Sequence, residues 1–154
     1  PEVSGLTSRI DCLLSMPEDS ARTVKDGELV LLHHGCEQVA ARLIMLDASE
    51  LAPGAKVLAQ CVLEKSLPIC WGDRMVLRDG SARTTLAGAR ALDIHPPLRN
   101  RKRPERIALL HALDQESALS AISCLLADNI YPLNLTAWSQ AMNRTVDSFS
   151  GALN

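Results

Sequence analysis

The sequence is poor in aromatic residues, which occupy only 3% of its 154 positions, so a buried core must be built from aliphatic side chains. It has no apolar run of the roughly 20 residues that cross a membrane and no secretory signal. An odd number of cysteines argues against a secreted disulfide framework. The sequence therefore predicts a cytoplasmic protein with no membrane partner, whose thiols are reduced and mostly buried: Cys12, Cys36, Cys61, Cys70 and Cys124.

The usual motifs of hydrolases are also missing. The chain has no Gly-x-x-x-x-Gly-Lys-Ser/Thr phosphate loop, no His-Glu-x-x-His zinc motif and no Gly-x-Ser-x-Gly nucleophile motif. His33, His34 and Cys36 lie close in sequence, but adjacent strand side chains point to opposite faces and would not easily reach one ion. We therefore predict no catalytic residue, no metal site and no cofactor in this chain. A small enzyme that uses Cys36 or Cys70 with a histidine is kept as an alternative.

What the chain does contain is typical of a globular protein, with 47% apolar and 22% charged residues. Before His95 the apolar residues alternate with polar ones or form short runs between turn residues, which indicates strands. We expect both faces of the apolar segment 28–33 to be buried, and Gly88 to mark a bulge or a close backbone approach. The pattern predicts a small barrel or sandwich of about six strands, at 7–14, 28–33, 38–46, 56–63, 74–78 and 86–92.

The pattern changes at Pro96-Pro97, where two prolines prevent a helix or a ladder from continuing. We place a domain boundary there, with a strand domain at 1–95, a linker at 96–103 and a helical unit at 104–154. Few contacts should cross the linker, so a protease should cut between Pro97 and Pro104 first. Within residues 99–106 one acid, Glu105, stands beside five basic residues: Arg99, Arg101, Lys102, Arg103 and Arg106.

Beyond the linker the apolar residues follow a helical period. Pro104 suits a first helical turn, Asp114 is expected to cap a second helix, and Asn134 and Thr145 are expected to cap a third and a fourth. Two short helices joined by a tight turn resemble a helix-turn-helix unit, here a winged helix without its wing. We expect the chain to be a fragment, whose last helix is partly exposed or mediates self-association through Val146, Phe149 and Leu153.

Two basic segments carry the functional prediction. Asp79, Gly80 and Ser81 form a tight turn that presents Arg78 and Arg83 next to small residues, an arrangement suited to a phosphate backbone. The linker adds Arg99, Arg101, Lys102 and Arg103, which can bind phosphates with an affinity that depends on salt. Together with the helical unit, these segments predict contact with nucleic acid.

Residues 78–90 also carry a family resemblance. The run Arg-Asp-x-Ser-Ala-Arg-x-Thr-Leu-Ala-Gly-Ala-Arg, followed by Pro96-Pro97 and residues 101–105, resembles the bacterial selenocysteine-specific elongation factor, SelB. More distantly, residues 83–88 resemble the closing Arg-Thr-Val-Gly-Ala-Gly run of elongation factor Tu, with Leu86 in place of the first glycine. The resemblance implies a six-stranded Greek-key-type β-barrel, like the third domain of elongation factor Tu, followed by part of a winged-helix region.

The same resemblance implies the partners. Such a factor delivers selenocysteinyl-tRNA to a UGA codon on the ribosome, and its C-terminal arm binds a hairpin in the selenoprotein mRNA. GTP and Mg²⁺ would bind in a domain that this chain lacks, and specific mRNA-hairpin binding is not expected from it. By position, the candidates for tRNA contact are Arg78, Ser81 and Arg83 in the turn, and Arg22 in the first long loop.

A DNA-binding regulator with a β ligand or oligomerisation domain and a helix-turn-helix is the main alternative function. The segment 145–154, which would be its recognition helix, contains no lysine or arginine, and only Arg144 precedes it. Recognition helices usually place basic or amide side chains at base edges. This composition favours the translation-factor interpretation.

Overall fold

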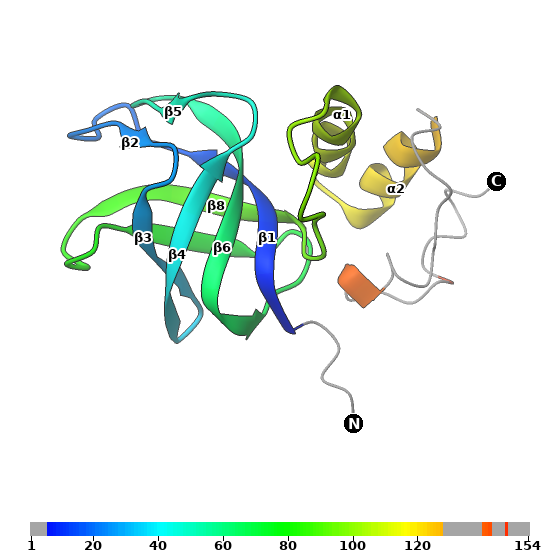
Figure 1. The fold of residues 1–154 in the computed structure, drawn as a ribbon. Coiled ribbons are helices and arrows are strands. Elements are labelled where there is room, and N and C mark those ends of the chain that lie inside the picture. Colours follow the sequence, from blue (N-terminus) through cyan, green and yellow to red (C-terminus); the bar gives the residue numbers. More distant parts are fainter. Residues whose placement is uncertain (1–5, 128–139, 143–146, 148–154) are drawn as a thin grey trace.

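In a computed structural model, residues 6–127, 140–142 and 147 can be described, and they form a strand domain followed by two helices (Figure 1). The helices are α1 (Pro104–Leu113) and α2 (Ala118–Ala127). The strands are β1 (Leu6–Ser15), β2 (Val24–Lys25), β3 (Leu29–His34), β4 (Glu37–Met45), β5 (Glu50–Leu51), β6 (Lys56–Pro68), β7 (Arg74–Arg78) and β8 (Thr85–Asp93).

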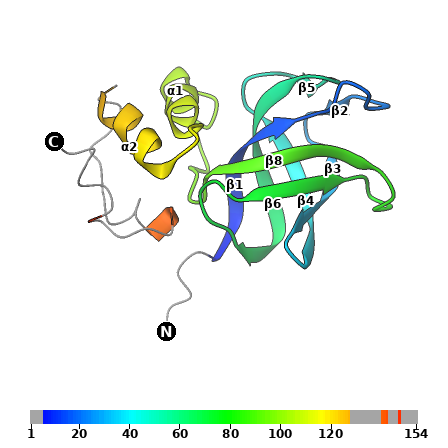
Figure 2. The same ribbon diagram turned by 180° about the vertical axis from the view of Figure 1, so that it is seen from behind.

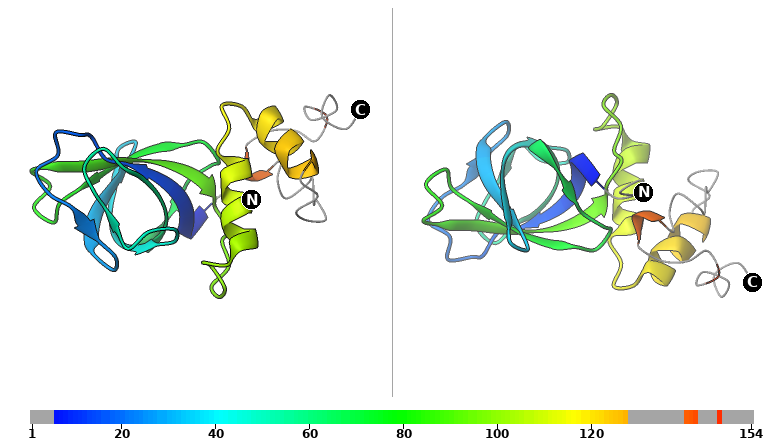
Figure 3. Two further views of the ribbon diagram at one scale, coloured as in Figure 1. Left: turned by 90° about the horizontal axis from the view of Figure 1, so that it is seen from above. Right: turned by 90° about the horizontal axis from the view of Figure 1, so that it is seen from below.

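Six of these strands close into an antiparallel barrel in the order β1-β6-β4-β3-β7-β8. The short strands β2 and β5 pair with each other, outside the barrel sheet. Seen along its axis, the barrel is a closed ring with the helices at one side (Figure 3). The predicted fold, a six-stranded barrel followed by a helical unit, is confirmed.

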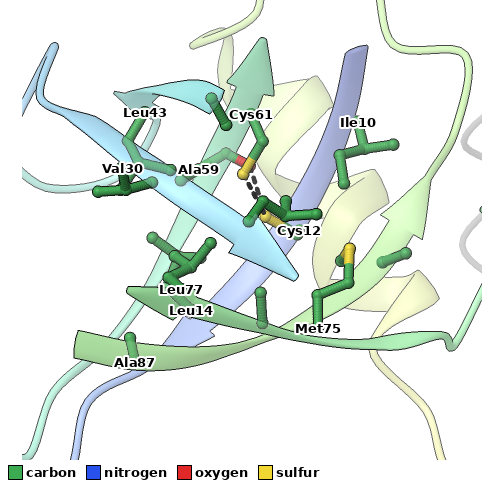
Figure 4. Packing of buried hydrophobic residues seen from close by; sticks show 14 of the residues in the cluster. Ile10, Cys12, Leu14, Val30, Leu43, Ala59, Cys61, Met75, Leu77 and Ala87 are labelled. Atoms are coloured by element: carbon green, nitrogen blue, oxygen red, sulfur yellow. Dashed lines mark hydrogen bonds between the residues drawn. The ribbon is translucent and has the colours of Figure 1, made fainter. Parts of the chain in front are cut away.

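The barrel interior is filled by the inward-facing residues of all six strands, which alternate with outward-facing ones along each strand. In β4 these are Val39, Ala41, Leu43 and Met45, as the sequence predicts, and all four are buried. Small side chains fill much of the narrow interior, and the thiols of Cys12 and Cys61 meet there with their sulfur atoms 3.3 Å apart (Figure 4). Such a core suits a small barrel, whose interior is just wide enough for its own side chains.

Three details of the strand prediction are wrong. β3 buries one face only, because Leu29 points outward and is 58% exposed. β6 continues through Pro68, beyond the predicted end at residue 63, because residues 67 and 68 pair with the start of β1. Gly88 marks neither a bulge nor a close approach: its pairing is regular, and a Cβ atom there would meet nothing within 4 Å.

The first helix follows its predicted start, with Pro104 in the first turn and Glu105 beside it. The second does not, because Ser117 caps α2, accepting a hydrogen bond of 3.1 Å from the amide of Ser120 to its hydroxyl. Asp114 instead ends α1, and its carboxylate accepts a hydrogen bond from Arg90 on β8 at 3.0 Å. The predicted cap of the second helix at Asp114 is therefore wrong.

The helices pack against the outside of the barrel and share a second apolar core with it. Trp71 strengthens this contact, since its indole N–H donates to the carbonyl of Leu113 at 3.0 Å. The expectation that few contacts cross from barrel to helices is therefore wrong, whereas the division at 96–103 stays a prediction. The buried residues of this second core are Leu46, Leu58, Leu92, Leu109, Leu110, Ala112, Leu113, Ala118, Ala121, Ile122 and Met142.

The predicted third and fourth helices fall almost wholly outside the described residues. Of the third, Ala141 and Met142 are described and buried, and the carbonyl of Ala141 accepts a hydrogen bond of 2.8 Å from the amide of Trp71. The segment proposed for self-association, Val146 to Leu153, lies outside the described part apart from Asp147. Among the described helices, none is long and apolar enough to cross a membrane.

Candidate nucleic-acid interface

The turn between β7 and β8 is organised by the carboxylate of Asp79. One of its oxygens, Oδ1, accepts hydrogen bonds from the hydroxyl of Ser81 at 2.9 Å and from the amides of Arg83 and Thr84 at 3.1 and 3.4 Å. The hydrogen bond from Ser81, followed by those from the backbone, lowers the pKa of Asp79 below 3.8. Ala82 has a positive φ of 57°, which completes the reversal. The turn is therefore a defined structure and not a loose loop.

The three candidate residues of this turn differ in how exposed they are and in which partners they have. Arg83 is exposed and makes no side-chain hydrogen bond or ion pair within the described residues. Arg78 is half-buried and donates to the carbonyl of Ala82 at 3.4 Å, while its Nε is buried without a partner among the described residues. Because the Ser81 hydroxyl donates to Asp79, it braces the turn and is not a free donor. Of the three, Arg83 is best placed to bind an anion.

Arg22 lies in the loop between β1 and β2, at the same end of the barrel as the β7–β8 turn (Figures 1 and 3). Its guanidinium forms an ion pair with Glu28 at 2.6 Å. Both side chains are partly exposed, and such surface pairs contribute roughly 0–1 kcal/mol. Arg22 can therefore exchange this partner for a phosphate at small cost.

The basic linker is divided by the fold. Arg101 is partly buried and donates to Oε1 of Gln60 on β6 at 2.8 Å, so it fastens the linker to the barrel. Lys102 is exposed. Arg99 and Arg103 are also exposed and line a pocket of about 320 Å³. Only three of the four candidate linker residues are therefore open to a ligand.

Arg106, also part of the predicted basic run, is buried and neutralised by two carboxylates of the barrel. Its guanidinium lies 2.7 Å from Asp11 on β1 and 2.6 Å from Asp93 on β8. Burial alone would lower the pKa of Arg106, but the charges of Asp93 and Asp11 outweigh it and raise the pKa. We call Arg106, Asp11 and Asp93 the Arg106 clamp. It joins α1 to the barrel and is unavailable to a nucleic acid.

The clamp predicts an unusual pH dependence. Burial raises the pKa of Asp11 above 3.8, against the opposing effect of Arg106. The folded protein then keeps this proton at pH values where the unfolded chain has lost it, so the Asp11 contribution to stability falls as pH rises from 3.8 through the raised pKa. Urea unfolding at several pH values should show the stability of the natural chain, relative to Asp11→Asn, decreasing across that window. An increase would contradict it.

The predicted residues do not form one site. The β7–β8 turn projects from the barrel end away from the helices, whereas the linker lies on the helical side (Figure 2). Sequence reasoning also missed the Arg106 clamp and three basic residues between these two ends, Lys56, Arg74 and Arg90. Each of them stands apart from other basic residues in the sequence. The alternation of inward and outward residues along its strand was the only sign that it faces outward.

The cysteine and metal alternatives receive no support. A hydrogen bond to Cys61, together with burial, raises the pKa of Cys12 well above 9.0. Burial, together with the charge of Asp73, raises the pKa of Cys70, which is the opposite of an activated thiolate. His34 contacts Asp73 at 3.0 Å, and the described residues contain no group of three or more side chains suited to a metal ion.

Comparison with known proteins tests the family resemblance. Residues 9–98 match the family model described as the selenocysteine-specific elongation factor, beta-barrel domain. Three curated relatives are all named selenocysteine-specific elongation factor. The one from Escherichia coli is 34% identical over 113 residues, which are 73% of this chain and 17% of the relative.

The other two relatives agree. The Haemophilus influenzae protein is 28% identical over 120 residues, 77% of this chain and 19% of the relative. The Desulfomicrobium baculatum protein is 33% identical over 115 residues, which are 71% of this chain and 17% of the relative. The chain thus spans less than a fifth of the length of these relatives. Through the barrel at residues 9–98, this chain belongs to the family of selenocysteine-specific elongation factors.

Proposed function

We propose that this chain is the part of a selenocysteine-specific elongation factor that helps to bind selenocysteinyl-tRNA and joins the tRNA-binding body to an arm that binds an mRNA hairpin. The observation that carries this proposal is the match of residues 9–98, nearly all of the barrel, to the beta-barrel domain of that family. The parent protein would act in the cytoplasm with the ribosome, and GTP with Mg²⁺ would bind to a domain outside this sequence. The chain itself would catalyse no reaction.

The RNA contact is assigned to the rigid end of the barrel. Arg83 stands exposed on a turn that Asp79 holds in place, and Arg22 lies in a loop at the same end. Guanidinium groups bind phosphates well, often through two hydrogen bonds. The described candidate residues are charged or small and include no aromatic side chain on which a base could stack. Recognition of the RNA backbone, independent of sequence, fits this surface best.

The second role is to hold the helical unit at a fixed angle to the barrel. The Arg106 clamp and the shared apolar core tie α1 to the strands, and Arg101 on Gln60 ties the linker before it. A flexible linker would lose the orientation of the arm, whereas a docked helix keeps it. We propose that tRNA bound at the barrel and mRNA bound beyond α2 are thereby held in a defined relative position.

The test compares Arg83→Glu with Lys65→Glu, which makes the same charge change on β6. Lys65 is exposed and pairs only with Glu37 at the surface, so both variants should stay folded. In filter binding, Arg83→Glu should weaken the association with selenocysteinyl-tRNA about tenfold and lower the salt slope by about one. Lys65→Glu should behave like the natural chain.

Equal affinities of these two variants at low salt would remove Arg83 from the interface. The same assay with duplex DNA tests the regulator alternative. Tighter binding to DNA than to the tRNA would contradict the translation-factor proposal, because the barrel would then serve a different polyanion. Binding of neither would show that this chain holds no nucleic acid by itself.

A further inference from the structure

A basic hollow lies on the outside of the barrel between the turn and the helices, and none of its residues belongs to the candidate sites above. It has a volume of about 450 Å³ and includes the end of α1 through Asp114. We call it the Gly88 hollow. Its polar and charged lining consists of Ser15, Lys56, Arg74, Arg90 and Asp114.

The strand register creates this hollow. Lys56, Ser15, Gly88 and Val76 pair in one row across β6, β1, β8 and β7. Their neighbours along the strands, including Leu14 and Ala89, are buried inside the barrel, so the row itself faces outward. Because Gly88 has no side chain, the row has a gap at its centre.

The next outward row supplies more positive charge, since Arg90 on β8 pairs with Arg74 on β7. Arg90 is held in place by Asp114, by the carbonyl of Gln115 and by the ring of Trp71, 5.0 Å from its guanidinium carbon. Lys56 and Arg74 are exposed and make no side-chain hydrogen bond or ion pair within the described residues. The hollow is thus lined by three cationic side chains and only one carboxylate, that of Asp114.

The lining identifies the class of ligand. No aromatic side chain lines the hollow, so a base has nothing on which to stack. An excess of cations around a gap with a hydroxyl group suits a phosphate. Arg74 and Arg78 both face outward on β7, four residues and so about 13 Å apart. A nucleic-acid backbone that contacts the β7–β8 turn can therefore continue along the hairpin to the hollow.

We infer that the Gly88 hollow binds a backbone phosphate of double-stranded RNA, as a second contact on the track that begins at the β7–β8 turn. This inference rests on the proposed RNA-binding function and extends it to the junction of barrel and helical unit. The contact reads no sequence. It places the RNA beside α1, and thus couples the position of the RNA to the part of the chain that the Arg106 clamp holds.

The test uses two variants that act by different means. Gly88→Gln fills the hollow with a neutral side chain, and a Cβ atom at this position meets nothing within 4 Å, so the strand should tolerate it. Lys56→Glu reverses one charge, with Lys65→Glu on the same strand as its matched control. In filter binding with selenocysteinyl-tRNA, Gly88→Gln and Lys56→Glu should each weaken the association about tenfold, and Lys65→Glu should not.

Nuclear magnetic resonance of the whole chain locates the contact. The amide signal of Gly88 should shift when a short RNA duplex is added. No shift with the duplex would overturn the inference. A shift with inorganic pyrophosphate but none with the duplex would assign the hollow to a free phosphate instead of an RNA backbone. If Arg83→Glu weakens binding while both hollow variants bind normally, the hollow is excluded and the proposed function stands. If the hollow variants weaken binding while Arg83→Glu does not, the hollow stands and the role of the turn fails.

Discussion

Replacing Arg106 with alanine is expected to lower the free energy of unfolding by about 3–5 kcal/mol. The substitution leaves Asp11, which is fully buried, and Asp93 without their common cation. The net value of a buried ion pair is often small, but removing one partner is costly because the remaining charge stays in a poorly solvated site. The loss should also free α1 from the barrel, since Arg106 is the residue of α1 that reaches both carboxylates.

Urea unfolding measures the first effect, with Arg103→Ala as the control. Arg103 precedes α1, is exposed, and should change stability by no more than about 0.5 kcal/mol. Limited proteolysis measures the second effect: the segment 97–104 should resist cleavage in the natural chain and be cut early in Arg106→Ala. Equal stability of the two variants, or early cleavage of the natural chain, would show that the clamp does not hold the helical unit.

The clamp also shows what could not be predicted from the sequence. Arg106 was counted in the basic run at 99–106 because four other basic residues stand near it. Its partner Asp11 lies 95 positions away, on the first strand. Nothing local distinguishes a neutralised arginine from an exposed one, so the expectation of few contacts across the linker was wrong. The position of the domain boundary at 96–103 stays a prediction.

The barrel was more predictable, because alternation is a local signal. Val39, Ala41, Leu43 and Met45 face inward as their spacing requires. The prediction that both faces of β3 are buried failed because the pattern of a strand cannot show whether its outer face is covered. Leu29 of this strand is apolar but faces outward. The α2 cap was misassigned because both Asp114 and Ser117 are good capping residues, and packing decided between them.

In the candidate interface, too, local features could be predicted and features assembled by the fold could not. The turn at 79–83 was found because its chemistry is local: Asp79 and Ser81 are turn residues, and the arginines adjoin them. The Gly88 hollow was missed because its lining comes from four strands and one helix end, with one polar or charged residue from each. Only the register of the closed barrel brings Lys56, Ser15 and Arg74 together around a glycine.

Leu86 provides the second large effect, because it occupies a place where the resembling run of elongation factor Tu has a glycine. It is 4% exposed and belongs to the core of the barrel. It also lies where the pairing of β7 with β8 shifts, between the pairs Leu77–Ala87 and Arg78–Thr85. A residue at this shift is unpaired in the ladder, and its side chain is turned into the core.

Leu86→Ala should therefore destabilise the chain by about 2–5 kcal/mol, through lost burial and the cavity that remains. Leu86→Gly should cost roughly 0.5–1 kcal/mol more, because glycine loses more conformational freedom on folding. Urea unfolding measures both, and Thr85→Ala, a change at the exposed neighbouring position, should have little effect. If Leu86→Gly were as stable as the natural chain, the side chain would add nothing to the barrel core. If Leu86→Gly is destabilised as expected, the result explains how the barrel accommodates a leucine in place of glycine. The leucine side chain turns inward at the register shift, beside the turn that carries Arg83.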